Sequence, residues 1–299
     1  MHPQRKIFSP GARRYNRAVP TLQFACLSAK TRRVAAGGRT LSLLEWAGQG
    51  RPVLCFLHGG AAHAHWFDLV VPHFTDRHHV VALDQRGHGE SDWARPPAYA
   101  TEDFAADLLG VLDALGCERV ILAGHSMGGH NAMAFAAWHP ERVRALVVID
   151  ARPALPEDRL AMMHRRGERP MRRYASEAEA VAVFRLLPRD TVADPALLAH
   201  VARAGLVARG GGFCYRFDPE ANRTRRPVDN WTLVDRITAP TLIVRAALSP
   251  ILPREMAERL RAAIRDARLV EIPEAYHHVM LDRPARLAAA LVEFLAALG

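Results

Sequence analysis

One short segment limits the possible folds of this chain more than any other, Gly124-His125-Ser126-Met127-Gly128-Gly129. An apolar run at 120–122 comes directly before it, and residues 127–138 have a helical composition and stop before a proline. A serine between a strand and a helix sits in a very tight turn, where only small residues fit on both sides and the hydroxyl is exposed. The first N–H of the helix, that of Met127, then points toward developing negative charge. The segment predicts a nucleophile at Ser126 rather than a glycine-rich structural turn.

The rest of the chain alternates between strand-like and helix-like segments, which predicts a mostly parallel sheet with helices on both faces. The expected strands are 40–46, 53–57, 79–83, 120–122, 143–149, 241–245 and 268–272. The expected helices are 101–115, 127–138, 254–264 and 284–298.

A region rich in arginine and proline interrupts this rhythm. Its expected elements are helices at 156–166, 177–187 and 195–207, followed by a flexible glycine run at 210–212. We therefore expect an α/β core at 31–150 and 233–299, a helical cap at 151–232 and a basic N-terminal extension at 1–30.

Three motifs together resemble those of the α/β-hydrolase superfamily, in its cap-bearing branch of esterases, lactonases and epoxide-hydrolase-like enzymes. His58-Gly59-Gly60 is similar to the oxyanion loop, and residues 84–91 (DQRGHGES) are similar to the turn after the next strand. The third motif is the turn at Ser126. The resemblance extends over roughly 41–298 and implies an α/β-hydrolase fold. It also implies that the N–H groups of Gly60 and Met127 hold the oxyanion.

The serine at position 126 narrows the chemistry that this resemblance implies. Dehalogenases and epoxide hydrolases of the superfamily need a carboxylate nucleophile, so acyl transfer is favoured instead. The expected reaction is hydrolysis of a carboxylic ester or lactone, with thioester, carbamate and C–C bonds as related substrates. A cofactor-free lyase or dioxygenase is an alternative, because such enzymes keep the serine and histidine without forming an acyl-enzyme.

The resemblance implies that the general base is a histidine in the loop between the last strand and the last helix. The family pattern is Gly-His with an acidic residue five positions later, and Asp282 follows His277 at that spacing. Tyr276 stands where the family has glycine. His277 is thus the expected base and His278 the alternative. We expect the histidines at 58 and 125 to be structural.

The acidic member of the triad departs from the family pattern. Residues 245–250 read Arg-Ala-Ala-Leu-Ser-Pro where the family resembles Arg-Gly-x-x-Ser-Asp, so Pro250 occupies the expected place of the acid. Asp150 ends the strand after the nucleophile helix, at the carboxyl edge of the sheet, and some lactonase-like and dehalogenase-like relatives resemble this arrangement. Asp150 is the expected acid, with Asp229 and Asp235 as alternatives or a turn-capping role for Asp150. Pro250 also leaves open a non-catalytic binding protein.

Candidate substrate contacts follow from position in the expected fold. Trp66 and Phe67 come shortly after the oxyanion loop, and Trp231 ends the cap. Such aromatic residues form the cap's own core as readily as a pocket. The arginines of the cap fit either an acidic substrate or a solvated face.

Composition excludes several classes of partner. The net charge is +9, but the basic residues are scattered without a nucleic-acid-binding motif, which favours a solvated surface. No apolar run approaches the roughly 18–20 residues that span a bilayer, and the first thirty residues lack the apolar stretch of a secretory signal.

The four cysteines have no metal-ligand spacing, and the fifteen histidines include no HExxH. We expect a cytoplasmic protein without metal or cofactor that acts on a small molecule, and the oligomeric state stays open.

Overall fold

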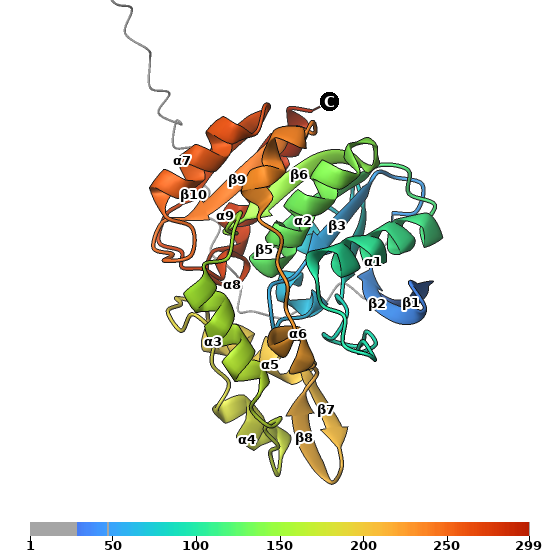
Figure 1. Cartoon of the computed structure of the whole chain (residues 1–299), viewed down its shortest axis with the longest axis vertical. Coiled ribbons are helices and arrows are strands. Elements are labelled where there is room, and N and C mark those ends of the chain that lie inside the picture. The colour runs from blue at the N-terminus through green and yellow to red at the C-terminus, as the bar shows by residue number, and fades with distance from the viewer. Residues whose placement is uncertain (1–28, 47, 299) are drawn as a thin grey trace, which may run out of the picture.

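A computed structural model of the protein describes residues 29–46 and 48–298 (Figure 1). Nearly all of the predicted N-terminal extension at 1–30 lies outside the described residues. Eight strands form one sheet in the order β1-β2-β4-β3-β5-β6-β9-β10. The strands are β1 (Lys30–Ala36), β2 (Arg39–Glu45), β3 (Val53–Leu57), β4 (His79–Leu83), β5 (Val120–His125), β6 (Val143–Ile149), β9 (Thr241–Ala246) and β10 (Ala267–Ile272). β1, β2 and β4 pair antiparallel and all other neighbours pair parallel, which confirms the predicted α/β class.

Alternating side chains of the central strands supply two apolar layers. In β3, Cys55 belongs to the layer under α1 (Thr101–Ala114), α2 (Met127–Trp138) and α7 (Arg254–Ala263). Phe56 points to the opposite face, which is covered by α8 (Val279–Asp282), α9 (Pro284–Ala296) and two 3-10 helices, η1 (Ala64–Phe67) and η2 (Val71–His73). Helices cover both faces of the sheet, and successive strand residues point to opposite faces, so every position of β3 and β4 is buried. This is why β3 is a continuous apolar run in the sequence and β4 is apolar after His79.

The edge strand β1 was not anticipated from the sequence. Its residues, KTRRVAA, carry three basic side chains, and only Val34 and Ala36 are buried. Basic residues on an edge strand discourage pairing with another chain. A strand of this kind has too few apolar positions to be recognised by its pattern.

The chain between β6 and β9 leaves the sheet and forms the lower part of the molecule in Figure 1. It contains α3 (Glu157–Gly167), α4 (Glu177–Ala182), α5 (Pro195–Ala204), β7 (Leu206–Arg209), β8 (Gly212–Tyr215), α6 (Glu220–Arg223) and the short η4 (Asn230–Thr232) and η5 (Val234–Arg236). The antiparallel hairpin β7–β8 corrects the expectation of a flexible glycine run. Gly210 and Gly211 have φ of 60° and 78°, the conformation that a two-residue hairpin turn requires.

The inserted segment is attached to the core by buried polar contacts. Asp218 accepts hydrogen bonds from the Tyr99 hydroxyl and from Arg95, both at 2.6 Å. A second attachment joins α5 to the loop after β3, where Nε2 of His63 lies 2.9 Å from the carbonyl oxygen of Val201. The insertion therefore rests on the carboxyl edge of the sheet. No helix in the described ranges is both long and apolar enough to cross a bilayer.

Candidate active site

Ser126 occupies the turn between β5 and α2 with φ 51° and ψ −115°. A non-glycine residue at such a positive φ is strained and persists only where its surroundings enforce it. The neighbouring glycines provide that enforcement. A Cβ at Gly124 would lie 2.4 Å from the carbonyl oxygen of Gly128, and one at Gly128 would lie 2.3 Å from that of Leu57. Only glycine fits at these positions, and the serine hydroxyl is left partly exposed.

His277 lies between Ser126 and Asp150, in the loop between β10 and α8. Its Nε2 is 3.0 Å from Oγ of Ser126, and its Nδ1 is 2.7 Å from Oδ2 of Asp150. A carboxylate only accepts hydrogen bonds, so Nδ1 carries the proton and Nε2 is free to accept the serine proton. His277 is 4% exposed and Asp150 is fully buried.

Asp150 is held in place from several directions. It follows the last residue of β6, and its own N–H donates to Val244 on the adjacent strand at 2.7 Å. Oδ1 accepts from the N–H of Ala246 at 3.1 Å, and Oδ2 accepts from the Ser249 hydroxyl at 2.5 Å. The buried carboxylate is thus well supplied with donors, which is the condition for keeping a charge inside a protein. Sequence reasoning missed Ser249, although it lies in the stretch that departs from the family pattern.

The other acidic candidates lie elsewhere. Asp229 is exposed and accepts from the N–H of Trp231 at 2.9 Å as the cap of η4. Asp235 is exposed within η5. Pro250 is exposed, and its carbonyl accepts from Arg152 at 3.2 Å. Of the acids proposed from the sequence, the structure places only Asp150 against His277.

Two buried residues fix the loop that carries His277. Oδ2 of Asp282 accepts from the N–H of Tyr276 at 2.7 Å, and Oδ1 accepts from the N–H of Val192 in the inserted segment at 3.1 Å. On the other side, Nε2 of His125 lies 2.9 Å from the carbonyl oxygen of His277. Burial, reinforced by the neighbouring histidines at 277 and 278, lowers the pKa of His125 well below its usual value. The neutral ring therefore carries its proton on Nε2 and donates it to that carbonyl.

The predicted oxyanion loop lies directly against the nucleophile. Its conformation is fixed by Gln85, whose N–H donates to Nε2 of His58 at 3.0 Å and whose side chain donates to the carbonyl oxygen of His58 at 2.7 Å. A Cβ at Gly59 would lie 2.9 Å from Nδ1 of His125 and 3.3 Å from Cβ of Ser126. One at Gly60 would lie 4.0 Å from the sulfur of Met127. Gly60 and the first residue of α2 therefore lie close together.

The structure separates the three predicted substrate contacts. Trp66 packs edge-on against His278, with ring centroids 5.2 Å apart, and His278 in turn adjoins His277. Phe67 is fully buried against Phe56 under the sheet, so its side chain belongs to the core. Trp231 packs against the α2 and α7 layer with the guanidinium of Arg259 4.0 Å above its ring. Of the three aromatic side chains, only Trp66 belongs to the cluster that includes the base.

His278, the alternative base, has a packing position. Its Nε2 lies 3.3 Å from the carbonyl oxygen of Pro188 in the inserted segment, and its ring is buried. Burial, with the adjacent His277 as a smaller cause, lowers the pKa of His278 to about 3. A neutral imidazole paired with a carbonyl, and without a carboxylate partner, is a poor proton acceptor.

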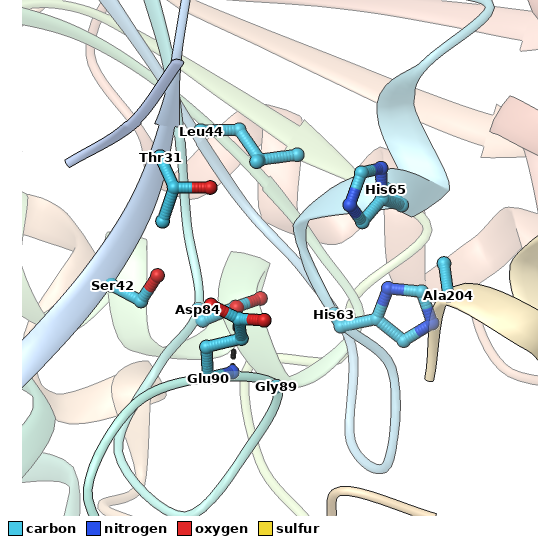
Figure 2. Close-up of a pocket in the computed structure, with 9 residues that line it drawn as sticks. All are labelled: Thr31, Ser42, Leu44, His63, His65, Asp84, Gly89, Glu90 and Ala204. Atoms are coloured by element: carbon cyan, nitrogen blue, oxygen red, sulfur yellow. Dashed lines mark hydrogen bonds between the residues drawn. The ribbon is translucent and has the colours of Figure 1, made fainter. Parts of the chain in front are cut away.

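A small polar cavity lies close to this region but is separate from the nucleophile (Figure 2). Its volume is about 50 Å³, enough for a few water molecules and too small for an organic substrate. Its lining residues are Thr31, Ser42, Leu44, His63, His65, Asp84, Gly89, Glu90 and Ala204.

Comparisons with known proteins agree with this fold. A family model described as alpha/beta hydrolase fold matches residues 52–284. The chain is 29% identical to 2-(acetamidomethylene)succinate hydrolase of Mesorhizobium japonicum, over 89% of this chain and 95% of that protein. It is also 29% identical to an esterase of Mycobacterium tuberculosis (85% of each chain) and 30% identical to epoxide hydrolase A of the same organism (89% and 97%). A crystal structure of E-2-(acetamidomethylene)succinate hydrolase superposes with a TM-score of 0.79 at 26% identity, over 90% of this chain and all of that one.

Proposed function

This chain belongs to the α/β-hydrolase family, and we propose that within this family it is a serine hydrolase that cleaves a carboxylic ester or lactone. One observation carries the proposal. The Ser126 hydroxyl, in its strained turn, lies 3.0 Å from Nε2 of His277. The other ring nitrogen of His277, Nδ1, faces the buried carboxylate of Asp150. That combination of nucleophile, base and orienting acid is the arrangement that activates a serine for acyl transfer.

The reaction begins when Oγ of Ser126 attacks the carbonyl carbon and Nε2 of His277 takes the hydroxyl proton. The tetrahedral intermediate collapses as the bond to the leaving oxygen breaks, and His277 returns the proton to that oxygen. Water then attacks the acyl-enzyme, with His277 as base, and the carboxylic acid leaves while Ser126 recovers its proton. No redox step or external electron donor is needed.

The oxyanion of each intermediate is held by two backbone N–H groups, those of Gly60 and Met127. The N–H of Met127 is available because the first residues of a helix have no acceptor one turn earlier. Loss of one such donor typically costs about 10²–10³ in kcat. The closeness of the Gly60 position to the Met127 side chain supports this pairing.

Asp150 keeps His277 in the tautomer with the proton on Nδ1 and stabilises the imidazolium that forms during attack. Its full burial strengthens this effect, because screening by water is weak there. The hydroxyl of Ser249 helps to fix the carboxylate. A role as acid also explains why Pro250 can stand in the usual family position without loss of the triad.

The inserted segment acts in this proposal as a cap that covers the site and sets specificity. Three of its residues contact the segment that follows β10 and carries His277. Thr191 and Val192 donate to Asp282, and the carbonyl of Pro188 faces His278. Movement of this segment would therefore change the position of His277. The relatives include an epoxide hydrolase, but that chemistry needs a carboxylate nucleophile, and position 126 is serine.

A panel of p-nitrophenyl esters and lactones tests the proposal directly. The wild-type protein is expected to hydrolyse at least one, and Ser126→Ala is expected to abolish that activity. Ser176→Ala, an exposed serine of the cap, is the matched control and should keep it. Undiminished hydrolysis by Ser126→Ala would overturn the proposal. Covalent labelling of Ser126 without turnover of any ester, lactone or amide would favour a lyase, dioxygenase or binding protein instead.

A further inference from the structure

A second cluster of possible ligand atoms lies outside the proposed active site, where the core meets the inserted segment. His65 in η1 and Asp68 directly after it belong to the core, and His200 belongs to α5. Oδ2 of Asp68 is 3.0 Å from Nδ1 of His65 and 2.7 Å from Nε2 of His200. One donor atom from each of the three residues lies within 4.8 Å of the other two.

The donor set is that of a transition-metal site. Two imidazole nitrogens and one carboxylate oxygen bind zinc at about 2.0–2.2 Å, and three protein ligands leave a fourth position for water. In a tetrahedral site with those bond lengths, neighbouring ligand atoms lie about 3.4 Å apart. The distances of 2.7 and 3.0 Å would have to open by about 0.7 and 0.4 Å to reach that separation. Small side-chain rotations would therefore admit an ion.

The carboxylate of Asp68 supplies an independent indication. Its side chain is only 7% exposed. Its second oxygen, Oδ1, is buried and has no hydrogen-bond partner among residues 29–46 and 48–298. Buried carboxylate oxygens are normally paired, so an unpaired one next to two imidazoles calls for a further positive group. A metal ion held by both oxygens of the Asp68 carboxylate would meet that requirement.

The electrostatic surroundings favour a cation. Asp84 lines the small cavity beside His65 and acts on its ring through its negative charge (Figure 2). Glu90 also lines this cavity, but its charge is paired with Arg33 and Arg216. Asp84 is not itself a free ligand, because its oxygens accept from the N–H groups of Ala64 and Glu90 at 2.8 and 2.9 Å. It contributes charge, and His65, Asp68 and His200 contribute the ligand atoms.

We propose that His65, Asp68 and His200 bind one divalent transition-metal ion of the zinc class, which joins α5 of the inserted segment to η1, the short helix that follows the Gly60 loop. The ligands come from both sides of this contact, so the complete site exists only when the inserted segment is docked on the core. Binding therefore favours the docked arrangement, since a ligand stabilises the state that binds it. The site is distinct from Ser126 and does not depend on the proposed hydrolysis.

The same three residues could instead form only a hydrogen-bonded contact, in which Asp68 accepts hydrogen bonds from the N–H groups of both imidazoles. His200→Gln separates the two cases. Glutamine can still donate to Asp68, but its amide is a poor metal ligand. The variant keeps the hydrogen-bonded contact and removes one of the three ligands.

A Zn²⁺ titration by calorimetry at pH 8, on metal-depleted protein, tests the site. The histidines at 125, 277 and 278 also lie close together, so His277→Ala provides the background that removes this second cluster. One Zn²⁺ is expected per chain in that background. Adding His200→Gln should weaken Zn²⁺ binding by about 100-fold. Loss of a residue that only hydrogen-bonds to a metal ligand already weakens metal affinity by about 10–100-fold, and His200 is a direct ligand in this proposal. Adding His73→Gln, an exposed histidine, should leave Zn²⁺ binding unchanged.

Two further measurements test whether the three residues are direct ligands and whether the variants are folded. Co²⁺ should give a tetrahedral absorption spectrum in the His277→Ala protein that is lost with His200→Gln or Asp68→Asn. Circular dichroism without metal should show that these variants remain folded. The proposal is overturned if His277→Ala binds no Zn²⁺, or if His200→Gln and Asp68→Asn bind it as tightly as their parent.

Discussion

Nδ1 of His277 lies 2.7 Å from Oδ2 of Asp150, although 127 residues separate them in the chain. The contact arises because β6, β9 and β10 are neighbouring parallel strands whose carboxyl ends lie at one edge of the sheet. Asp150 follows β6 and His277 follows β10 at that edge. The loop after β9, where the family usually has its acid, still contributes here through Ser249, which donates to the same oxygen at 2.5 Å. In our proposal the acid of the triad therefore follows β6 rather than β9.

Asp150→Asn should lower kcat for ester hydrolysis by about 10³–10⁴-fold at pH 7, with a small effect on KM. An amide at this position favours the wrong tautomer of the base and cannot stabilise its charge. Steady-state kinetics on a p-nitrophenyl ester measures the loss. Asp229→Asn is the matched control and should behave as wild type. Equal losses in the two variants would remove Asp150 from the mechanism.

Ser249→Ala should lower kcat by about 10- to 100-fold, because one hydrogen bond to a charged group contributes about 1.5–3 kcal/mol. The hydroxyl touches no substrate, so KM should stay nearly constant. Ser249→Thr keeps a hydroxyl at the same position and should restore most of the activity. If alanine and threonine are equally impaired, packing rather than the hydrogen bond to Asp150 explains the effect.

Adjacent glycines of the oxyanion loop should respond differently to alanine. In Gly59→Ala the new methyl group would lie 2.9 Å from His125 and 3.3 Å from Cβ of Ser126. Displacement of the nucleophile by a fraction of an ångström should reduce kcat by at least about tenfold. Gly60→Ala has room beside Met127 and keeps its backbone N–H, so its kcat should stay within about threefold of wild type. Kinetics on the folded variants checks this, and an inactive Gly60→Ala beside an active Gly59→Ala would contradict it.

Stability should fall between pH 7 and pH 5. Burial, and secondarily the charge on Arg225, lowers the pKa of His130 to about 3, and burial likewise lowers the pKa of His63 and of His278 to about 3. The unfolded chain protonates these rings near pH 6.5, while the folded chain does not until about pH 3. Between those values the unfolded state binds more protons, so each such histidine removes about 2 kcal/mol of stability at pH 5.

His65 works in the opposite direction, since the hydrogen bond and charge of Asp68 outweigh burial and raise its pKa. Urea unfolding at pH 7 and pH 5, with a chelator present, measures the balance. His130→Asn can keep a hydrogen bond to the carbonyl of Arg152 and has no titrating ring. The loss of stability on acidification should be smaller in this variant by about 2 kcal/mol. An unchanged loss would show that His130 does not resist protonation in the folded state.

The core of this fold could be predicted from local patterns, because buried parallel strands are continuous apolar runs. The bounds of β3, β4 and β6 agree with the sequence prediction. The spacing from His277 to Asp282 has a physical basis, since Asp282 fixes the N–H of the residue before the base. The catalytic roles of Ser126, Asp150 and His277 stay predictions, although the structure brings all three together.

The remaining features depended on contacts between distant parts of the chain. Hairpin β7–β8 was missed because two glycines of a tight turn look the same in sequence as a flexible run. Trp231 was expected at the substrate site, but its position is set by packing under Arg259. No local signal connects Ser249 to Asp150, since that contact exists only where two strand ends meet.

The most direct test of the account is labelling with a fluorophosphonate, followed by intact mass spectrometry and peptide mapping. The reagent needs an activated serine and an oxyanion site, and it does not require knowledge of the substrate. Wild-type protein should take up one label on Ser126, Asp229→Asn should react at the same rate, and Asp150→Asn should react at least about 10²-fold more slowly. Absence of label, a label on another serine, or undiminished labelling of Asp150→Asn would contradict the Ser126–His277–Asp150 assignment.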